Sequence, residues 1–273
     1  MEYSTLYDLI RFLQYGNHLH IGVIFLEGCS GSAFSLPPSQ TIHDSAVCWK
    51  AKGPGGNNRR CYRCRQAAIK KAVHEHRDFG GYCINGVYEY TRPVMKVSKC
   101  AAVIYIGNIL VPGDRRGRLA RVLGEDTALL ETMERDFDLE KCRSLGQLIE
   151  SYIRALWETL PPGGDSKSSS VVENIKQYID ANLDCEIKLQ DVAPLFHYNP
   201  QYLGRLFKQE TGMCFSEYVN RERVKRAATY LSSEMPIIHV AYQVGFNTVT
   251  YFNRVFRRHF GLSPSAYRRK NGE

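Results

Sequence analysis

The stretch that decides the fold of the C-terminal part is Ile237–Arg268, IIHVAYQVGFNTVTYFNRVFRRHFGLSPSAYR. A short apolar run leads to Gly245, and a second run with two unlike faces follows the turn. Aromatic and aliphatic residues recur at helical spacing between Phe252 and Phe260. The opposite face of this second run carries polar and basic residues: Thr250, Arg254 and Arg257. A helix, a glycine turn and a helix with one apolar and one basic stripe together predict a helix-turn-helix.

The same pattern occurs a second time, 49 residues earlier (position 203 against position 252). The apolar positions and closing glycines correspond in pairs: Leu203 with Phe252, Phe207 with Phe256, and Gly212 with Gly261. The polar positions correspond too: Gln201 with Thr250, Arg205 with Arg254, and Lys208 with Arg257. Core packing alone explains only the repeated apolar face. A repeat of both faces predicts two helix-turn-helix units in one domain.

These residues closely resemble the DNA-binding domain of the AraC/XylS family of transcriptional regulators. The resemblance covers roughly residues 171–269, and its motifs are Tyr202–Gly212, Arg223–Ala227, Val244–Phe246 and Gly261–Arg268. It implies that a long helix over about 215–231 joins the two units rigidly. One monomer would then read two major-groove segments about one turn apart, roughly 34 Å along the DNA.

Each predicted recognition helix offers side chains to the DNA. Asn199 fits the N-cap of the first helix, and Pro200 fits its first turn. Arginine pairs with guanine and glutamine with adenine in the major groove, whereas outlying basic residues contact phosphates. On this basis we expect Lys208, Arg257 and Arg258 at phosphates. The predicted DNA-binding residues are Pro200, Gln201, Tyr202, Arg205, Lys208, Val249, Thr250, Asn253, Arg254 and Arg257.

Composition limits the function classes. The chain has 273 residues and a formal net charge of +8, which suits two domains and a DNA-binding protein. It has no apolar run of about 18 residues and no basic start before an apolar segment, so we expect a cytoplasmic protein without a membrane partner. A Pro-, Gly- and Ser-rich stretch, residues 161–170, predicts a linker between domains at 1–160 and 171–273.

The N-terminal region predicts mixed α and β structure, so the fold class of the whole chain is α+β. Hydrophobic periodicity indicates a helix at 4–15, a strand at 21–26, a helix at 57–77, strands at 82–90 and 100–110, and helices at 119–136 and 144–160. The pair Arg92-Pro93 predicts a bend after the second strand. Two patterns predict helix starts, Ser144-x-x-Gln147 and Ser170-x-x-Glu173.

Four cysteines form the most informative pattern of this region. Cys61 and Cys64 share a face of the predicted helix, Cys48 precedes them and Cys83 follows them. Four thiols are a candidate metal site for zinc or an iron–sulfur cluster. The alternative is that these buried cysteines line a core or a ligand pocket, because the pattern contains one CxxC and two isolated residues.

The same region resembles the PocR-type sensory domain, over roughly residues 5–160. The matching residues are Cys48, Arg63–Arg65, Cys83 with Gly86, Arg92–Val94 and Ala102–Leu110, and Ile84 stands where the family often has histidine. The resemblance implies a PAS/GAF-like fold that senses small hydrocarbon derivatives such as short diols or aldehydes. Its candidate ligand-sensing residues are Cys48, Cys64, Cys83 and Tyr105.

Together these features predict a sequence-specific transcription regulator that responds to a small-molecule effector. The alternative is a redox- or metal-sensing regulator that uses Cys48, Cys61, Cys64 and Cys83. The expected partners are operator DNA, the effector and, for an activator, RNA polymerase; the 144–160 helix is a candidate homodimer interface. No local pairing of a reactive cysteine with a general base or acid stands out in the sequence, so we do not expect an enzyme.

Overall fold

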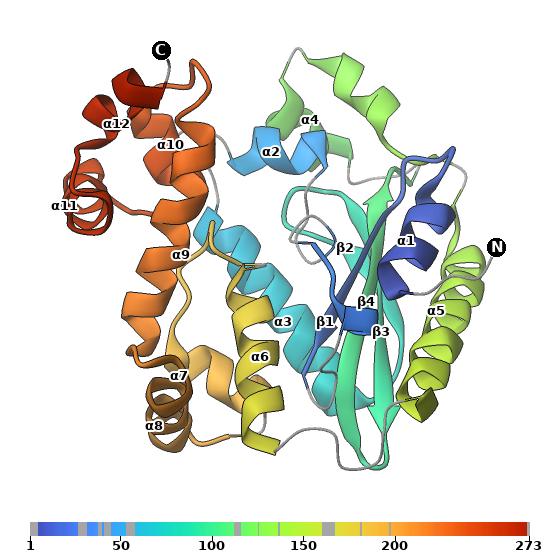
Figure 1. Ribbon diagram of the computed structural model, residues 1–273. Helices are drawn as coiled ribbons and strands as arrows, with labels where there is room; N and C mark the ends of the chain where they lie inside the picture. The colour runs from blue at the N-terminus through green and yellow to red at the C-terminus, as the bar shows by residue number, and fades with distance from the viewer. Residues whose placement is uncertain are drawn as a thin grey trace. The chain divides into compact units, whose positions relative to one another are not determined.

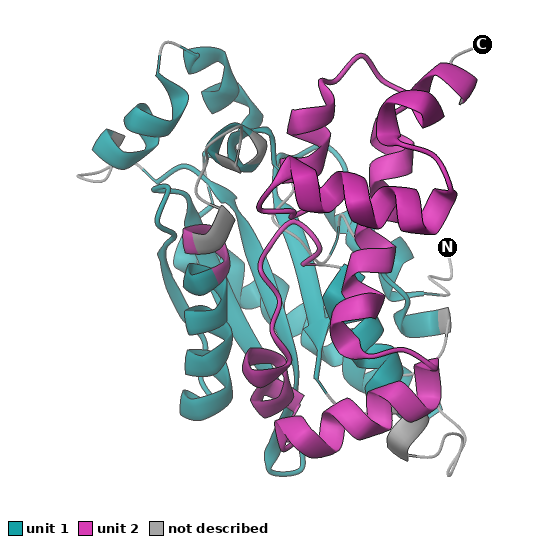
Figure 2. Cartoon of the chain, turned by 90° about the vertical axis from the view of Figure 1, so that its left-hand side faces the viewer, with its two compact units in different colours: residues 1–51, 63–181 teal, residues 52–62, 182–273 magenta. Residues whose placement is uncertain are grey.

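The computed structural model describes residues 5–26, 32–37, 40, 45–52, 58–111, 116–124, 126–135, 137–159, 167–180, 182–196 and 198–271. Contacts between residues divide the chain into two compact units (Figure 2): residues 1–51 with 63–181, and residues 52–62 with 182–273. By these contacts α6 (Lys167–Asp180) groups with the first unit. Its first turn occupies the last four residues of the predicted linker, 161–170, while residues 161–166 lie outside the described part.

The first unit is built on a four-stranded antiparallel sheet in the order β1-β4-β3-β2. The strands are β1 (His20–Phe25), β2 (Phe79–Tyr82), β3 (Tyr88–Lys96) and β4 (Lys99–Ile109). The central strand β4 is buried on both faces, which explains its unbroken apolar run. The predicted strands at 21–26 and 100–110 are therefore confirmed.

Helices cover both faces of this sheet (Figure 1). One face packs on α1 (Leu6–Gln14) and α5 (Leu139–Thr159), and α3 (Asn58–Glu75) lies on the other. Alternate strand residues such as Val23 and Ile104 meet Ile149 of α5 in one core. The predicted helices at 4–15 and 57–77 are confirmed as α1 and α3.

Smaller elements complete the unit. They are the 3₁₀ turns η1 (Ser32–Phe34) and η3 (Thr127–Thr132), and the helices α2 (Ala46–Lys52) and α4 (Arg116–Leu123). Val47, Leu119, Leu123 and Met133 join Val87 in a second, smaller cluster. This small antiparallel sheet with helices agrees with the α+β expectation for the region.

Two predictions for this region are wrong: the single strand at 82–90 and the bend at Arg92-Pro93. Residues 83–87 form the turn between β2 and β3, where Gly86 has a φ of +86°. Pro93 lies inside β3 and pairs in register with Val103 of β4. The pairing of β2 with β3 ends at Thr91. Pro93 therefore has a neighbouring strand on one side only, where a missing N–H is tolerated.

Two helix predictions also need correction. The region 119–136 is not one helix, because α4 ends before Gly124, whose φ is +59°, and η3 follows. The predicted start at Ser144 is wrong as well, since α5 begins at Leu139. Asp138 caps it instead: its carboxylate accepts a hydrogen bond from the Lys141 backbone N–H at 2.8 Å. Likewise, Ser170 lies inside α6 and not at its start.

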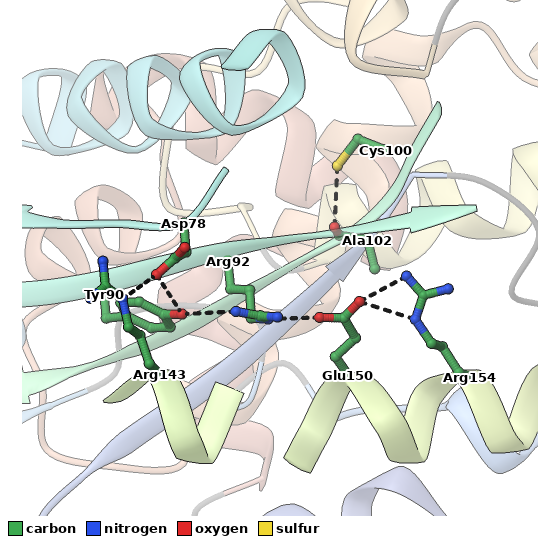
Figure 3. A network of polar contacts seen from close by, with 8 residues as sticks. All are labelled: Asp78, Tyr90, Arg92, Cys100, Ala102, Arg143, Glu150 and Arg154. Atoms are coloured by element: carbon green, nitrogen blue, oxygen red, sulfur yellow. Dashed lines mark hydrogen bonds and ion pairs between the residues drawn. The ribbon is translucent and has the colours of Figure 1, made fainter. Parts of the chain in front are cut away.

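A polar network holds α5 against β3 (Figure 3). Arg92 of β3 donates to the carboxylate of Glu150 at 2.7 Å, and Arg154 donates to the other oxygen of the same carboxylate at 2.8 Å. At the other end of the network, Asp78 accepts from Arg143 and from the hydroxyl of Tyr90. The helix can approach this closely because a Cβ at position 146, a glycine, would lie only 2.9 Å from the Tyr90 ring.

The second unit is helical. Its elements are α7 (Leu189–Val192), the 3₁₀ turn η4 (Ala193–Phe196), α8 (Pro200–Thr211), α9 (Phe215–Tyr230), α10 (Ile237–Gln243), α11 (Val249–Phe260) and α12 (Pro264–Asn271). The predicted long helix at 215–231 is confirmed as α9. Among the described residues no helix is both long and apolar enough to span a membrane.

Candidate nucleic-acid interface

Helix α8 presents the first set of predicted DNA-binding residues. Its start is set by Asn199, whose side chain accepts a hydrogen bond from the Gln201 N–H at 2.9 Å, followed by Pro200 in the first turn. Its end is set by Gly212, which has a φ of +71°. Three apolar residues fix one face in the core: Leu203, Leu206 and Phe207. The other face leaves four predicted residues exposed: Gln201, Tyr202, Arg205 and Lys208.

Gly204 has a packing role in this unit. A Cβ at this position would lie 3.0 Å from a methyl group of Leu189 in α7. The glycine is partly covered, so its missing side chain allows α7 and α8 to pack closely. It does not leave a gap on the exposed face that carries Arg205.

Helix α11 repeats this design with different side chains. Thr248 is its N-cap and accepts a hydrogen bond from the Tyr251 N–H at 3.3 Å, and Gly261, with a φ of +73°, ends the helix. Phe252 and Phe256 are fully buried. Four predicted residues are exposed: Thr250, Asn253, Arg254 and Arg257. Val249 is half-buried and packs on the core of this unit, so only part of it faces solvent.

The connecting helix α9 holds the two heads, which we define as α8 and α11. In Figure 1 both heads are seen nearly end-on, near opposite ends of α9, so their axes run roughly parallel. A helix of 16 residues is about 24 Å long. Two parallel recognition helices on one rigid helix can enter successive major grooves on the same side of a duplex.

Arg223 fixes α9 to both helix-turn-helix units, and sequence reasoning missed this role. Its guanidinium is buried and donates hydrogen bonds to the carbonyl oxygens of Leu183, at 2.9 Å, and Cys185. The same group lies over the Phe246 ring at 5.6 Å. Burial lowers the pKa of Arg223 to about 10, so it remains charged at neutral pH. The sequence did contain a signal for this role, because Arg223 is a basic residue on an otherwise apolar face of the predicted helix.

Gly245 makes this contact possible in the turn between α10 and α11. Its φ is +89°, a left-handed conformation that favours glycine. A Cβ here would collide with the carbonyl oxygen of Leu183 and lie 3.0 Å from the Arg223 guanidinium. The glycine turn seen in the sequence therefore serves both the chain reversal and the close packing on Leu183.

In the first unit, the structure brings several candidate sensing residues together between α3 and the sheet. The thiols of Cys64 and Cys83 and the phenol of Tyr105 all lie within electrostatic range of Glu89 of β3. Cys83 is also within range of Cys48. The sequence had not pointed to Glu89. Arg65 is only 3% exposed, and its charge lowers the pKa of both Tyr105 and Cys64. The sequence had pointed to Arg65 only as part of a motif.

The environment of these groups favours their neutral forms. Burial raises the pKa of Cys64 and of Cys83, and the negative charge of Glu89 raises both further. Burial also raises the pKa of Tyr105 well above its usual value, against the opposing effect of Arg65. Metal binding and nucleophilic chemistry both use the thiolate, which this environment disfavours.

The predicted metal site, Cys48, Cys61, Cys64 and Cys83, gains no support from this geometry. Within the described ranges, no three His, Cys, Asp or Glu side chains are placed to hold one metal ion. No disulfide joins the eight cysteines that the structure describes. The metal- or redox-sensing alternative is therefore not favoured.

Comparison with known proteins places the similarity in the second unit. A helix-turn-helix domain family matches residues 192–270. The regulatory protein PocR of Salmonella typhimurium is 35% identical over 111 residues, 40% of this chain and 37% of that protein. The regulatory protein SoxS of the same organism is 33% identical over 101 residues, 37% of this chain and 94% of SoxS.

Two further similarities cover a similar share of this chain. The uncharacterized HTH-type transcriptional regulator YfiF of Bacillus subtilis is 40% identical over 102 residues, 37% of this chain and 32% of that protein. Among solved structures, the C-terminal domain of AraT, a response regulator from Geobacillus stearothermophilus, has 36% identity and a TM-score of 0.37, covering 38% of this chain and 88% of that one. The matches thus span about a third of the length of PocR and YfiF.

Proposed function

The chain belongs to the AraC family of helix-turn-helix transcription regulators, and we propose that it regulates transcription by binding double-stranded DNA sequence-specifically through α8 and α11. One observation carries this proposal. Both heads are capped helices with a buried apolar face and an exposed polar and basic face, and α9 joins them. Such a repeated exposed face has no role in the core and suits readout of base edges.

The two heads divide the contacts between bases and phosphates. In the first head Arg205 and Gln201 read base edges, and Lys208 contacts a phosphate. Pro200 and Tyr202 lie at the start of the same helix, beside the DNA backbone. In the second head Arg254 and Asn253 read base edges with Thr250, and Arg257 contacts a phosphate. The exposed part of Val249 is close enough to this face to contact a thymine methyl group.

The first unit, on this proposal, is a PocR-like sensory domain with a PAS/GAF-like fold that binds a small effector, such as a small hydrocarbon derivative. The neutral polar groups around Cys64, Cys83 and Tyr105 would line the site, with Cys48 beside them. Effector binding would shift the population toward the state that binds DNA or activates best. RNA polymerase, for an activator, and a second copy of the chain are the further proposed partners.

The test begins with selection of duplexes from a random-sequence pool by the full chain. We expect enrichment of a site with two short blocks about one helical turn apart, 10–10.5 base pairs centre to centre. A single block would mean that only one head reads DNA. No enrichment at all would refute sequence-specific binding. Effectors are then screened by their effect on affinity for the selected duplex; a ligand that binds Cys64→Ser as tightly as wild type would place the site elsewhere.

A further inference from the structure

A groove with a volume of about 710 Å³ runs between α9 and α11 in the second unit. Its lining residues recur at helical spacing on both helices, so the groove follows one face of each. On α9 this face includes Asn220 and Arg221, and on α11 it includes Tyr251, Arg254 and Arg258. None of the base-reading assignments above uses the α9 side of this groove.

The groove is positively charged. Its lining contains three arginines, Arg221, Arg254 and Arg258, and one acid, Glu217. The Glu217 carboxylate is already engaged: hydrogen bonds from the Cys214 thiol and from the Cys214 N–H lower its pKa, and the nearby charges of Arg258 and Lys208 lower it further. The charges of the lining therefore favour an anion.

Arg221 is held in place before any partner binds. Its guanidinium lies 4.6 Å from the centre of the Tyr218 ring and donates to Glu222 at 2.8 Å. Glu222 is shared, because Lys225 donates to the same carboxylate at 3.1 Å. Two cations share one anion, so a net positive charge remains. A preorganised side chain loses less conformational entropy when it binds a ligand.

Neutral donors accompany the arginines. Asn220 donates to the Tyr251 hydroxyl at 2.9 Å, which leaves the phenol hydrogen able to donate to another acceptor. Burial lowers the pKa of His259, and Lys225 and Arg221 lower it further, so the imidazole is neutral at pH 7 and offers one N–H. Arginine, tyrosine hydroxyl and asparagine amide donors are among the groups that contact DNA phosphates.

The groove is continuous with the faces assigned to DNA. Arg254 belongs to both the exposed face of α11 and the groove. At the other end, Glu217 lies within electrostatic range of Lys208, on the exposed face of α8. The groove thus lies along α9 between the two heads, where a duplex engaged by both would pass.

We propose that this groove binds the sugar–phosphate backbone of the DNA between the two major-groove segments, with Arg221 and Arg258 as phosphate contacts. This proposal rests on the proposed function. It makes α9 a DNA-binding element in addition to a connector. Contacts of this kind position the protein on the duplex and read no base edge.

The experiment measures the dissociation constant of the full chain for one selected duplex between 50 and 300 mM KCl. The variants are Arg221→Gln and Arg258→Gln. The matched control is Arg269→Gln, which removes the same charge from an exposed residue of α12 outside the groove lining. Circular dichroism melting checks that each variant folds; surface changes of this kind usually alter stability by less than about 0.5 kcal/mol.

Each groove variant should lower the slope of log Kd against log [KCl] by about 0.9, where Kd is the dissociation constant. This change corresponds to a roughly eightfold loss of affinity at 0.1 M salt. The base preference of the selected site should not change, and Arg269→Gln should stay within twofold of wild type. Arg221→Lys should restore the slope, since it restores the charge. These results would support the phosphate contact.

Wild-type slopes in both groove variants would overturn the proposal while leaving the proposed function intact. A changed base preference would also overturn it, because the arginines would then be reading bases. If the wild-type chain enriches no duplex from the random pool, the proposed function is wrong and the groove proposal falls with it.

Discussion

Arg223→Met tests the idea that one buried guanidinium holds the two helix-turn-helix units on α9. The substitution keeps most of the side-chain volume and removes the donors to the carbonyl oxygens of Leu183 and Cys185. A buried acceptor left without its donor costs about 1–3 kcal/mol. Removing the charge recovers part of the desolvation that lowers the pKa of Arg223 to about 10. The expected net loss of stability is about 3 kcal/mol.

Hydrogen exchange measured by mass spectrometry on the full chain resolves this loss, because it reports each unit separately. In the regime where exchange follows the opening equilibrium, about 3 kcal/mol corresponds to roughly 100-fold faster exchange. We expect this acceleration across α9 and the 182–185 turn, and unchanged exchange in the sheet of the first unit. Affinity for the selected duplex should fall in parallel, because the orientation of the heads loosens.

The matched control is Lys225→Met, an exposed residue of the same helix, which should change exchange less than threefold. Arg223→Lys should fall between wild type and Arg223→Met, because an ammonium group can reach one carbonyl but cannot reproduce the forked geometry of the guanidinium. If Arg223→Met exchanged no faster than Lys225→Met, the reasoning about the buried carbonyls would be refuted.

Three further outcomes are expected. Gly245→Ala should destabilise the second unit by about 3–5 kcal/mol, because left-handed backbone strain adds to a collision of the new Cβ with backbone. Gly261→Ala has open space around the new Cβ and should cost only about 1 kcal/mol. Equal losses of stability for the two variants in urea unfolding would contradict this. Arg254→Ala should weaken specific binding by about 1–3 kcal/mol and relax preference at one base pair, and uniform weakening across sequences would instead indicate a phosphate contact. Burial of Asp78 raises its pKa, but hydrogen bonds, from Arg143 above all, outweigh this and lower the pKa below its ordinary value of 3.8. The contribution of Asp78 to stability is therefore complete above about pH 4 and is lost as the pH falls through the lowered pKa. The urea midpoints of wild type and Asp78→Asn should converge in acid, and a constant difference between them from pH 6 to pH 3 would argue against the shift.

The elements that the sequence misplaced share a physical cause. Pro93 reads as a strand breaker unless it is known that β2 has already ended beside it. Ser144 with Gln147 reads as a capping box, although Asp138 provides the cap one and a half turns earlier. In both cases the local pattern was genuine, but the neighbouring chain decided whether it was used.

The candidate interface was predictable to a large extent, because exposed faces of helices follow directly from residue spacing. Arg205 and Arg254 are exposed as the repeat required, and both heads end at the predicted glycines. Val249 was less predictable, since its partial burial depends on neighbours distant in sequence. The groove between α9 and α11 was missed, because it arises only when Arg221 and Arg258, 37 positions apart (258 − 221), face each other.

The sequence by itself determined the repeated unit: a 49-residue spacing of apolar and basic positions is a local pattern that each helix expresses through its own periodicity. Only the tertiary structure decided what the buried polar residues do. Arg223 and Gly245 come together with Leu183 from sites up to 62 positions apart (245 − 183), and Glu89 comes within electrostatic range of Cys64 and Tyr105. Partners of buried charges are chosen by packing, because a buried charge must find whichever donor or acceptor the fold brings within reach.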